Sequence, residues 1–247
     1  MHKSKGQATQ IDPNDLTSDE LYKLMIGSVV PRPICWASAL SRDGIANLTP
    51  FSFFTVVSRT PPMVSLTIQP RSDRVQLKDT LINARETGEF VVNIVSLAQA
   101  DKMHLTSVEY LPDENEFDIT GLGKTPSVDV LPPRVAGVPI AMECKVHFIT
   151  PMGEVGDHVL VGRAVRFHFR EDMWLPGGRV NTAALQPVGR LAAECTLADA
   201  VFTCPMRTEA MAEYASRPWR RIDGRVVGWS SLTEKTWSAA GNVKLAE

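Results

Sequence analysis

Several segments of the chain are rich in the apolar, β-branched and aromatic residues that are typical of β-strands, and one of them alternates hydrophobic and polar positions. Strands are predicted at residues 29–41, 51–58, 63–69, 89–95, 138–153 and 155–172. In the last of these, Val159, Val161 and Val165 alternate with polar or small residues, as in a half-buried antiparallel strand. Asp43 and Gly44 follow the first segment, where they predict a hairpin turn. The pattern therefore indicates a mainly β protein with antiparallel strands.

Four further segments carry helical signals. The clearest covers residues 75–88 and ends in Gly88, a residue type favoured at helix C-termini. A short helix is predicted within 17–25, with Thr17 or Ser18 as its N-cap. The other two predicted helices cover residues 96–108 and 207–218. Because helices and strands do not alternate as βαβ units, the fold class is an antiparallel barrel or sandwich with a few helices.

The order of these elements divides the chain into three parts. They are a polar lead-in at residues 1–20, one domain at residues 21–204 and a C-terminal extension at residues 205–247. The extension contains a predicted helix and three tryptophans. We expect its helix and tail to pack on the domain or on a partner subunit, because large aromatic side chains are seldom left in water.

Charge and cysteine content narrow the function classes. With 26 basic and 28 acidic residues the formal net charge is −2, and no basic run indicates a nucleic-acid partner. No window has the roughly 18 apolar residues of a membrane span, and no secretory signal is recognisable. The four cysteines are widely spaced, which favours reduced thiols. We expect a cytoplasmic protein that binds neither nucleic acid nor membrane.

The stretch NLTPFSFF, residues 47–54, combines aromatic side chains with a proline. Pro50 has no N–H to donate, so a strand that contains it must lie at a sheet edge or contain a bulge. Unpaired backbone groups there, with the hydroxyls of Thr49 and Ser52, suit a flat heteroaromatic ligand. The alternative is a kinked core strand, which the octet on its own favours.

A second group of polar residues lies in RSDRVQLKDT, residues 71–80. Its members are Arg71, Ser72, Arg74, Lys78, Asp79 and Thr80. Cations and hydroxyls near a helix start can bind a phosphate monoester, although on spacing alone a solvated basic face is the better interpretation. The chain contains no Walker loop and no G-x-G-x-x-G after a strand.

The remaining chemistry-bearing residues give weaker signals. Asp157 and His158 stand at a predicted strand entrance, where they either position a substrate or cap a turn. No metal site is expected, since strand alternation places Cys144 on the opposite face from Glu143 and His147. No nucleophile motif is present either. Few acids, bases or nucleophiles favour an enzyme in which a cofactor carries the chemistry.

Taken in order, these stretches resemble the flavin reductase-like, FMN-binding split-barrel family. The first matching block is VVPRPICWASALSRDGIANLTPFSFFTVVSRTPPMVSL, in which P-R-P-I, D-G-x-x-N-L-x-P-F-S-x-F and P-P have family-like spacing. The later blocks are KDTLINARETGEFVVNIV, VPIAMECKV, GDHVLVGRAV and LQPVGRLAA. The resemblance covers residues 28 to about 193.

This resemblance implies a homodimer of six-stranded antiparallel split β-barrels, with FMN in a cleft at or near the subunit interface. The residues implied to line or flank the isoalloxazine are Asn47, Leu48, Thr49, Pro50, Ser52 and Phe53. Those implied to surround the phosphate are Arg71, Ser72, Lys78, Asp79 and Thr80. The family's G-D-H motif implies that His158 contacts the second substrate. At residues 190–193 the chain has RLAA where many relatives have R-L-G-G, so the substrate-pocket wall is not defined.

The function that the resemblance implies is an FMN-binding oxidoreductase, an NAD(P)H-dependent flavin reductase. Hydride would pass from NADH or NADPH to flavin, and electrons would leave to free flavin, a partner oxygenase or a small molecule such as a nitroaromatic. One alternative is an electron-carrier flavoprotein that another protein reduces, as in flavoredoxin. Another is a structural barrel without flavin. No residue in the sequence selects between NADH and NADPH.

Overall fold

The computed structural model describes residues 9–176 and 178–198, with the backbone of 219–220 and 226–227. The described residues form two compact units. The first contains 9–168 and 187–197, and the second contains 169–176, 178–186, 198, 219–220 and 226–227. The predicted helix at 207–218 and the tryptophan side chains of the extension lie outside the described residues. The division at residues 20 and 204 therefore stays a prediction.

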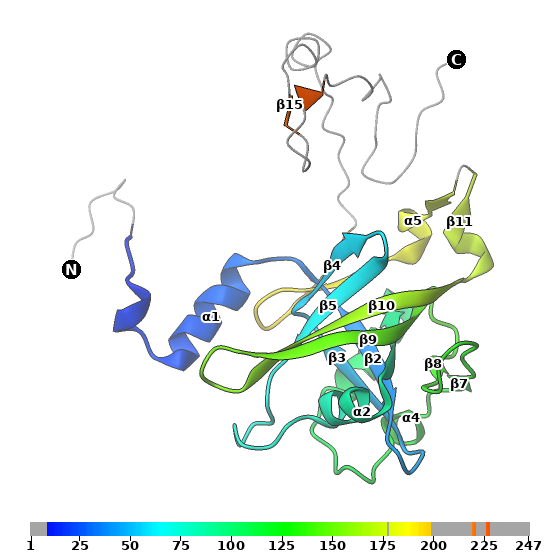
Figure 1. Cartoon of the computed structure of the whole chain (residues 1–247), viewed down its shortest axis with the longest axis horizontal. Coiled ribbons are helices and arrows are strands. Elements are labelled where there is room, and N and C mark those ends of the chain that lie inside the picture. The colour runs from blue at the N-terminus through cyan, green and yellow to red at the C-terminus, as the bar shows by residue number, and fades with distance from the viewer. Residues whose placement is uncertain (1–8, 177, 199–218, 221–225, 228–247) are drawn as a thin grey trace. The chain divides into compact units, whose positions relative to one another are not determined.

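The first unit is built on a curled antiparallel sheet (Figure 1). In the described part of the chain this sheet has seven strands in the order β3-β2-β6-β9-β10-β5-β4. Their bounds are β2 Cys35–Leu40, β3 Ala46–Phe51, β4 Phe54–Arg59, β5 Pro62–Ile68, β6 Glu89–Ile94, β9 Ile140–Met152 and β10 Asp157–Phe169. In Figure 1 the long β9–β10 hairpin, drawn in green, passes across β2 and β3.

Smaller elements surround this sheet in the first unit. The helices are η1 Pro13–Asp15, α1 Ser18–Ser28, α2 Asp79–Thr87, η2 Leu97–Gln99, α3 Ala100–Leu105 and α4 Glu116–Ile119. A three-stranded sheet joins β1 Arg32–Pro33, β13 Val188–Arg190 and β14 Cys195–Leu197, and β7 Lys124–Thr125 pairs with β8 Arg134–Val135. The second unit contains η3 Glu171–Met173, β11 Trp174–Leu175, β12 Arg179–Val180, α5 Thr182–Leu185, β15 Trp219–Arg220 and β16 Val226–Val227.

A two-residue connection brings the two ends of the seven-stranded sheet together. Strands β3 and β4 stand at opposite ends of the strand order, yet only Ser52 and Phe53 separate them in the chain. Such a short link spans at most about 11 Å, so the sheet must curl until its edges meet at this corner. Thr67 N–H donates to the Phe53 carbonyl oxygen at 2.8 Å and secures the corner to β5.

The count of six strands was wrong for this sheet. The predicted strand at 51–58 is only partly formed, because the chain turns at Ser52 and Phe53 before β4 begins. Residues 46–51 instead form the additional strand β3, which pairs with β2 in register Pro50 to Trp36. The antiparallel, mainly β prediction is confirmed, as is the hairpin turn, where Gly44 has φ of 82°.

Strand β2, with the sequence CWASAL, is buried on both faces, which explains why all but one of its residues are apolar. Cys35 and Ala37 belong to the cluster inside the curl, which contains Phe90 and is covered by α2. Trp36 belongs to a second cluster on the other face, which also contains Met103 of α3. The Trp36 indole N–H donates to Thr106 Oγ1 at 2.8 Å, so its polar atom is satisfied in this core.

Two of the predicted helix ends lie where the local sequence signals place them, and one does not. Thr17 and Glu20 form a capping box at α1, and Gly88 ends α2 with φ of 76°, so both signals are confirmed. However, α2 begins at Asp79 and not at Val75. The Asp73 carboxylate accepts hydrogen bonds from the N–H groups of residues 75 and 76 at 2.9 Å, which holds this segment in a turn.

The tight interior of the curl can be tested at Gly162. A Cβ on Gly162 would overlap the Phe90 ring, which is fully buried. We expect Gly162→Ala to lower the unfolding free energy by about 1–3 kcal/mol, because the packed interior must shift. Gly27→Ala is the control, since a Cβ there meets nothing within 4 Å and stands in helix α1. The control should be neutral or more stable in urea unfolding, and an equally stable Gly162→Ala would contradict the packing described.

Candidate functional site

A cavity of about 200 Å³ lies beside the corner where the sheet edges meet. It is lined by Tyr22, Ile34, Thr49, Pro50, Phe51, Ser52, Phe53, Thr67, Gln69, Lys78, Met103, His104, Ser107 and Arg190. The wall therefore combines aromatic rings, hydroxyl groups and cationic side chains. All of these residues belong to the first unit.

Five of the predicted site residues lie together on this wall. They are Thr49, Pro50, Ser52, Phe53 and Lys78. Among the described strands β3 pairs only with β2, so Pro50 lies on an edge strand, where the proline without an N–H breaks no ladder. This confirms the prediction that Pro50 marks a sheet edge. Lys78 reaches the cavity because it immediately precedes α2.

Other residues of the wall were not found by sequence reasoning. Tyr22 comes from α1, Met103 and His104 come from α3, and Arg190 comes from β13. The Tyr22 and Phe53 rings have centroids 6.5 Å apart and an interplanar angle of 37°. These residues belong to no local motif, because only the folded chain brings α1, α3 and β13 to the same corner.

Arg32 connects α1 to the corner. Its guanidinium donates to the carbonyl oxygens of Ile26, Val29 and Leu191 at 2.5, 2.8 and 2.7 Å. Its Nε donates to Ser52 Oγ at 3.4 Å. Burial lowers the pKa of Arg32, and the nearby Arg190 adds to this effect. Backbone carbonyls at the end of α1 thus hold a buried cation, which places α1 against the cavity.

Asn47, Leu48 and Thr80 lie behind the wall and do not line the cavity. The Glu116 carboxylate accepts from Leu48 N–H at 2.9 Å and from Asn47 Nδ2 at 2.7 Å. Asn47 Oδ1 accepts a short hydrogen bond from the Thr80 hydroxyl. This chain of contacts joins β3, α2 and α4. The Leu48 N–H, which we expected at the ligand, is therefore already satisfied inside the protein.

Glu116 is a buried acid with a strongly shifted pKa. It is 3% exposed, and burial raises its pKa to about 7 even though Leu48 and Asn47 donate to it. The nearby Asp79 carboxylate raises the pKa further. The protonation of Glu116 therefore changes near neutral pH, directly behind the strand that carries Thr49 and Pro50.

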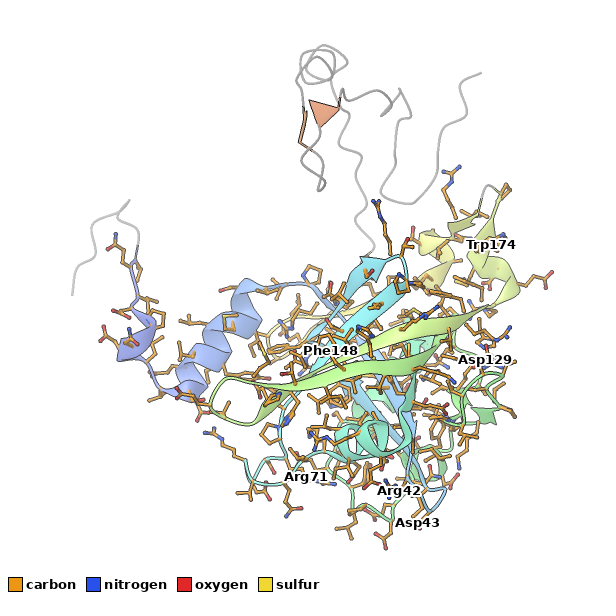
Figure 2. All side chains as sticks on the ribbon, viewed as in Figure 1. Arg42, Asp43, Arg71, Asp129, Phe148 and Trp174 are labelled. Atoms are coloured by element: carbon orange, nitrogen blue, oxygen red, sulfur yellow. The ribbon has the colours of Figure 1, made fainter. Side chains whose placement is uncertain are left out.

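A polar cluster lies at the start of α2, and Figure 2 shows Arg71 in the loop before this helix. Lys78 Nζ donates to the Glu109 carboxylate at 2.9 Å. Ser72 donates to the same carboxylate through its N–H at 3.0 Å and its hydroxyl at 2.7 Å. Arg71 donates to Asp79 at 2.5 Å. The predicted phosphate residues are thus brought together, except Thr80, which is buried.

Two predicted residues lie outside these groups. The Arg74 guanidinium donates to Asp19 of α1 at 2.5 Å and does not join the polar cluster. His158, at the start of β10, does not line the cavity, and its Nδ1 lies 2.8 Å from the Gly156 carbonyl oxygen. The neighbouring Asp157 has a buried Oδ1 without a hydrogen-bond partner among the described residues, and burial raises its pKa. A contact between His158 and a second substrate stays a prediction.

The described residues contain no group of three or more histidine, cysteine, aspartate or glutamate side chains that could hold a metal ion. None of their helices combines the length and apolar character needed to cross a membrane. Cys35, Cys144 and Cys195 carry free thiols, and burial raises the pKa of Cys144 to about 12.

The cavity, the curled sheet and the polar cluster agree with a match to a known protein family. A family profile described as "Flavin reductase like domain" matches residues 26–180. This match spans more than half of the chain, so the protein belongs to the flavin reductase-like family. The fold and the family together define a split-barrel protein of the flavin reductase-like type.

Individual relatives support the same assignment. An uncharacterized protein of Aquifex aeolicus is 41% identical over 173 residues, which is 70% of this chain and 87% of that protein. The crystal structure of nitrilotriacetate monooxygenase component B from Bacillus cereus is similar with a TM-score of 0.78 and 31% identity, covering 81% and 100% of the chains. Pseudomonas fluorescens 2-nitrobenzoate 2-nitroreductase NbaA has a TM-score of 0.73 and 30% identity, covering 81% and 97%.

The titration of Glu116 gives a test of the buried contacts behind the cavity. The pKa of Glu116 is about 7 in the folded protein and 4.5 in the unfolded chain. Between these two pH values the folded carboxyl keeps a proton that the unfolded one releases. The unfolding free energy should therefore fall as pH rises through this window, by about 3 kcal/mol in total. Glu116→Gln should remove this component while keeping an amide oxygen for Leu48 N–H.

Urea unfolding between pH 5 and 8 measures the effect. Glu114→Gln is the control, since Glu114 is exposed and lies two residues away in the same segment. The control should keep the pH slope of the original protein. Equal slopes in all three proteins would show that Glu116 does not titrate in this range.

Proposed function

We propose that this protein is an FMN-binding oxidoreductase that uses NADH or NADPH to reduce the flavin. The observation that carries the proposal is one cavity wall with Phe53, Tyr22 and the hydroxyls of two further residues, which Lys78 connects to a cluster of hydrogen-bond donors suited to an oxyanion. Flat ring and phosphate monoester are the two ends of FMN. Family membership supports flavin as the ligand.

The cavity residues fit the ring end of this ligand. Phe53 and Tyr22 offer aromatic faces, and Thr49 and Ser52 offer hydroxyl donors and acceptors at the same wall. Pro50 keeps the edge of β3 free of a further strand, so the wall stays accessible. We assign the ring-flanking role to these wall residues, with Asn47 and Leu48 supporting them from behind.

The polar cluster fits the phosphate end. Ser72 N–H, Ser72 Oγ and Lys78 Nζ already converge on the two oxygens of one carboxylate, Glu109. A backbone N–H, a hydroxyl and an ammonium group that share one oxyanion are also the donors that bind phosphate. Arg71 is held by Asp79 and by the Tyr110 carbonyl oxygen, so its role is to position the loop.

When bound, the flavin would supply the redox chemistry by accepting hydride from the nicotinamide and passing electrons to an acceptor. The protein would contribute binding and orientation. The hydroxyl groups of Thr49 and Ser52 would orient the ring, and Arg190 would add positive charge at the wall. We keep His158 as the candidate for contact with the second substrate.

A second candidate function is the reduction of a nitroaromatic compound with the same flavin. The similarity to 2-nitrobenzoate 2-nitroreductase at 30% identity favours it. The similarity to a monooxygenase component B at 31% identity supports a partner oxygenase as the electron acceptor. In either case we expect a homodimer, as the family resemblance implies.

Spectroscopy with added substrates tests the proposal. The purified protein should bind FMN, and NADH or NADPH should bleach the flavin absorption rapidly in anaerobic stopped-flow mixing. Addition of 2-nitrobenzoate to the reduced protein distinguishes the second function through reoxidation without oxygen. If only a protein reductase bleaches the flavin absorption, the protein is an electron carrier and not an NAD(P)H-dependent enzyme. Protein that binds no flavin at all would overturn the proposal.

The phosphate assignment predicts a selective effect of Lys78→Met. This change removes the ammonium group from the polar cluster while most of the apolar stem is retained. FMN affinity should fall about 10-fold or more, because a charge-assisted hydrogen bond is lost, while the urea midpoint changes little. Lys145→Met, at an exposed position of β9 beside Glu89, is the matched control. Fluorescence titration measures the FMN affinity of both variants. Equal FMN affinities for Lys78→Met and Lys145→Met would contradict the assignment.

A further inference from the structure

Glu109 occupies the centre of the predicted phosphate site. Its carboxylate accepts hydrogen bonds from Ser72 N–H, Ser72 Oγ and Lys78 Nζ, so it uses three donors that a phosphate would need. Glu109 itself comes from the segment between α3 and α4, more than 30 residues away in the chain. A carboxylate of the chain itself therefore occupies the position that the ligand phosphate would take.

The charges in this site balance without any ligand phosphate. The Lys78 and Glu109 side chains are only 22% and 29% exposed, so their interaction is partly shielded from water. Burial opposes ionisation, but hydrogen bonds from Lys78 and Ser72 outweigh it and lower the pKa of Glu109. The carboxylate is thus ionised at neutral pH. A phosphate cannot share these donors with it, because two anions at hydrogen-bond range repel each other.

The backbone of the segment that carries Glu109 is held by hydrogen bonds that do not involve the Glu109 carboxylate. The Arg71 guanidinium donates to the Tyr110 carbonyl oxygen at 3.0 Å, and the Tyr110 hydroxyl donates to the Leu105 carbonyl oxygen at 3.3 Å. Glu109 has side-chain hydrogen bonds to Ser72 and Lys78, and both partners can exchange it for another oxyanion. Rotation of this one side chain would free all three donors.

We propose that Glu109 is a specificity-determining residue, which competes with the ligand phosphate for Ser72 and Lys78 and so lowers the preference for FMN over riboflavin. This inference rests on the proposed flavin site. A riboflavin ring can enter the cavity while Glu109 keeps the donors satisfied. FMN must first displace the carboxylate, and that cost reduces the gain from its phosphate. The flavin would therefore exchange readily between protein and solution.

Glu109→Gln tests the proposal because it removes the charge and keeps the size of the side chain. Affinities for FMN and riboflavin are measured by quenching of flavin fluorescence. We expect FMN affinity to rise about 10-fold, as for one lost like-charge competitor, with riboflavin affinity unchanged within about 2-fold. Glu114→Gln, an exposed glutamate on the same segment, should leave both affinities unchanged. Glu109→Ala serves as a second variant if Glu109→Gln unfolds at a lower urea midpoint.

The outcomes separate this inference from the proposed function. An unchanged ratio of FMN to riboflavin affinity in both Glu109 variants would overturn the inference, and a fall in FMN affinity would show that Glu109 instead positions the donors. Inorganic phosphate gives a readout that needs no flavin. Phosphate should raise the melting temperature of Glu109→Gln more than that of the original protein or of Glu114→Gln. If neither flavin binds any variant, the proposed function fails, while this phosphate effect still decides the role of Glu109.

Discussion

The two-residue connection between β3 and β4 is the constraint on which the rest of the first unit depends. It joins the two edges of a seven-stranded sheet, so the sheet must curl into a split barrel. The curl encloses Phe90 and its neighbours as a core. The same corner presents Ser52 and Phe53 to the cavity. Fold and candidate site therefore share one structural cause.

The strand at this corner is held by polar contacts as well as by packing. Glu116 holds the backbone and side chain of residues 47 and 48 from one side, and Arg32 holds the Ser52 hydroxyl and the end of α1 from the other. Both groups are buried and both have shifted pKa values. Because their partners are mostly backbone atoms, they control the position of the cavity wall more than its chemical character.

The candidate site separates two kinds of recognition. Aromatic and hydroxyl groups at the cavity suit a flat ring, whereas the cluster around Ser72 and Lys78 suits an oxyanion. The Glu109 carboxylate accepts hydrogen bonds from these donors, so a group of the chain itself satisfies them. The family match agrees with a flavin ligand.

The sequence by itself determined the features that depend on neighbouring residues. The Thr17 capping box, the turns at Gly44 and Gly88 and the edge position of Pro50 follow from residue type, because each involves a hydrogen bond or dihedral angle within a few residues. The family resemblance also located five residues of the cavity wall. Only the tertiary structure decided that Asn47 faces Glu116 and that Tyr22, His104 and Arg190 complete the wall. These contacts join residues far apart in the chain, so they exist only once the curled sheet and its helices have packed together.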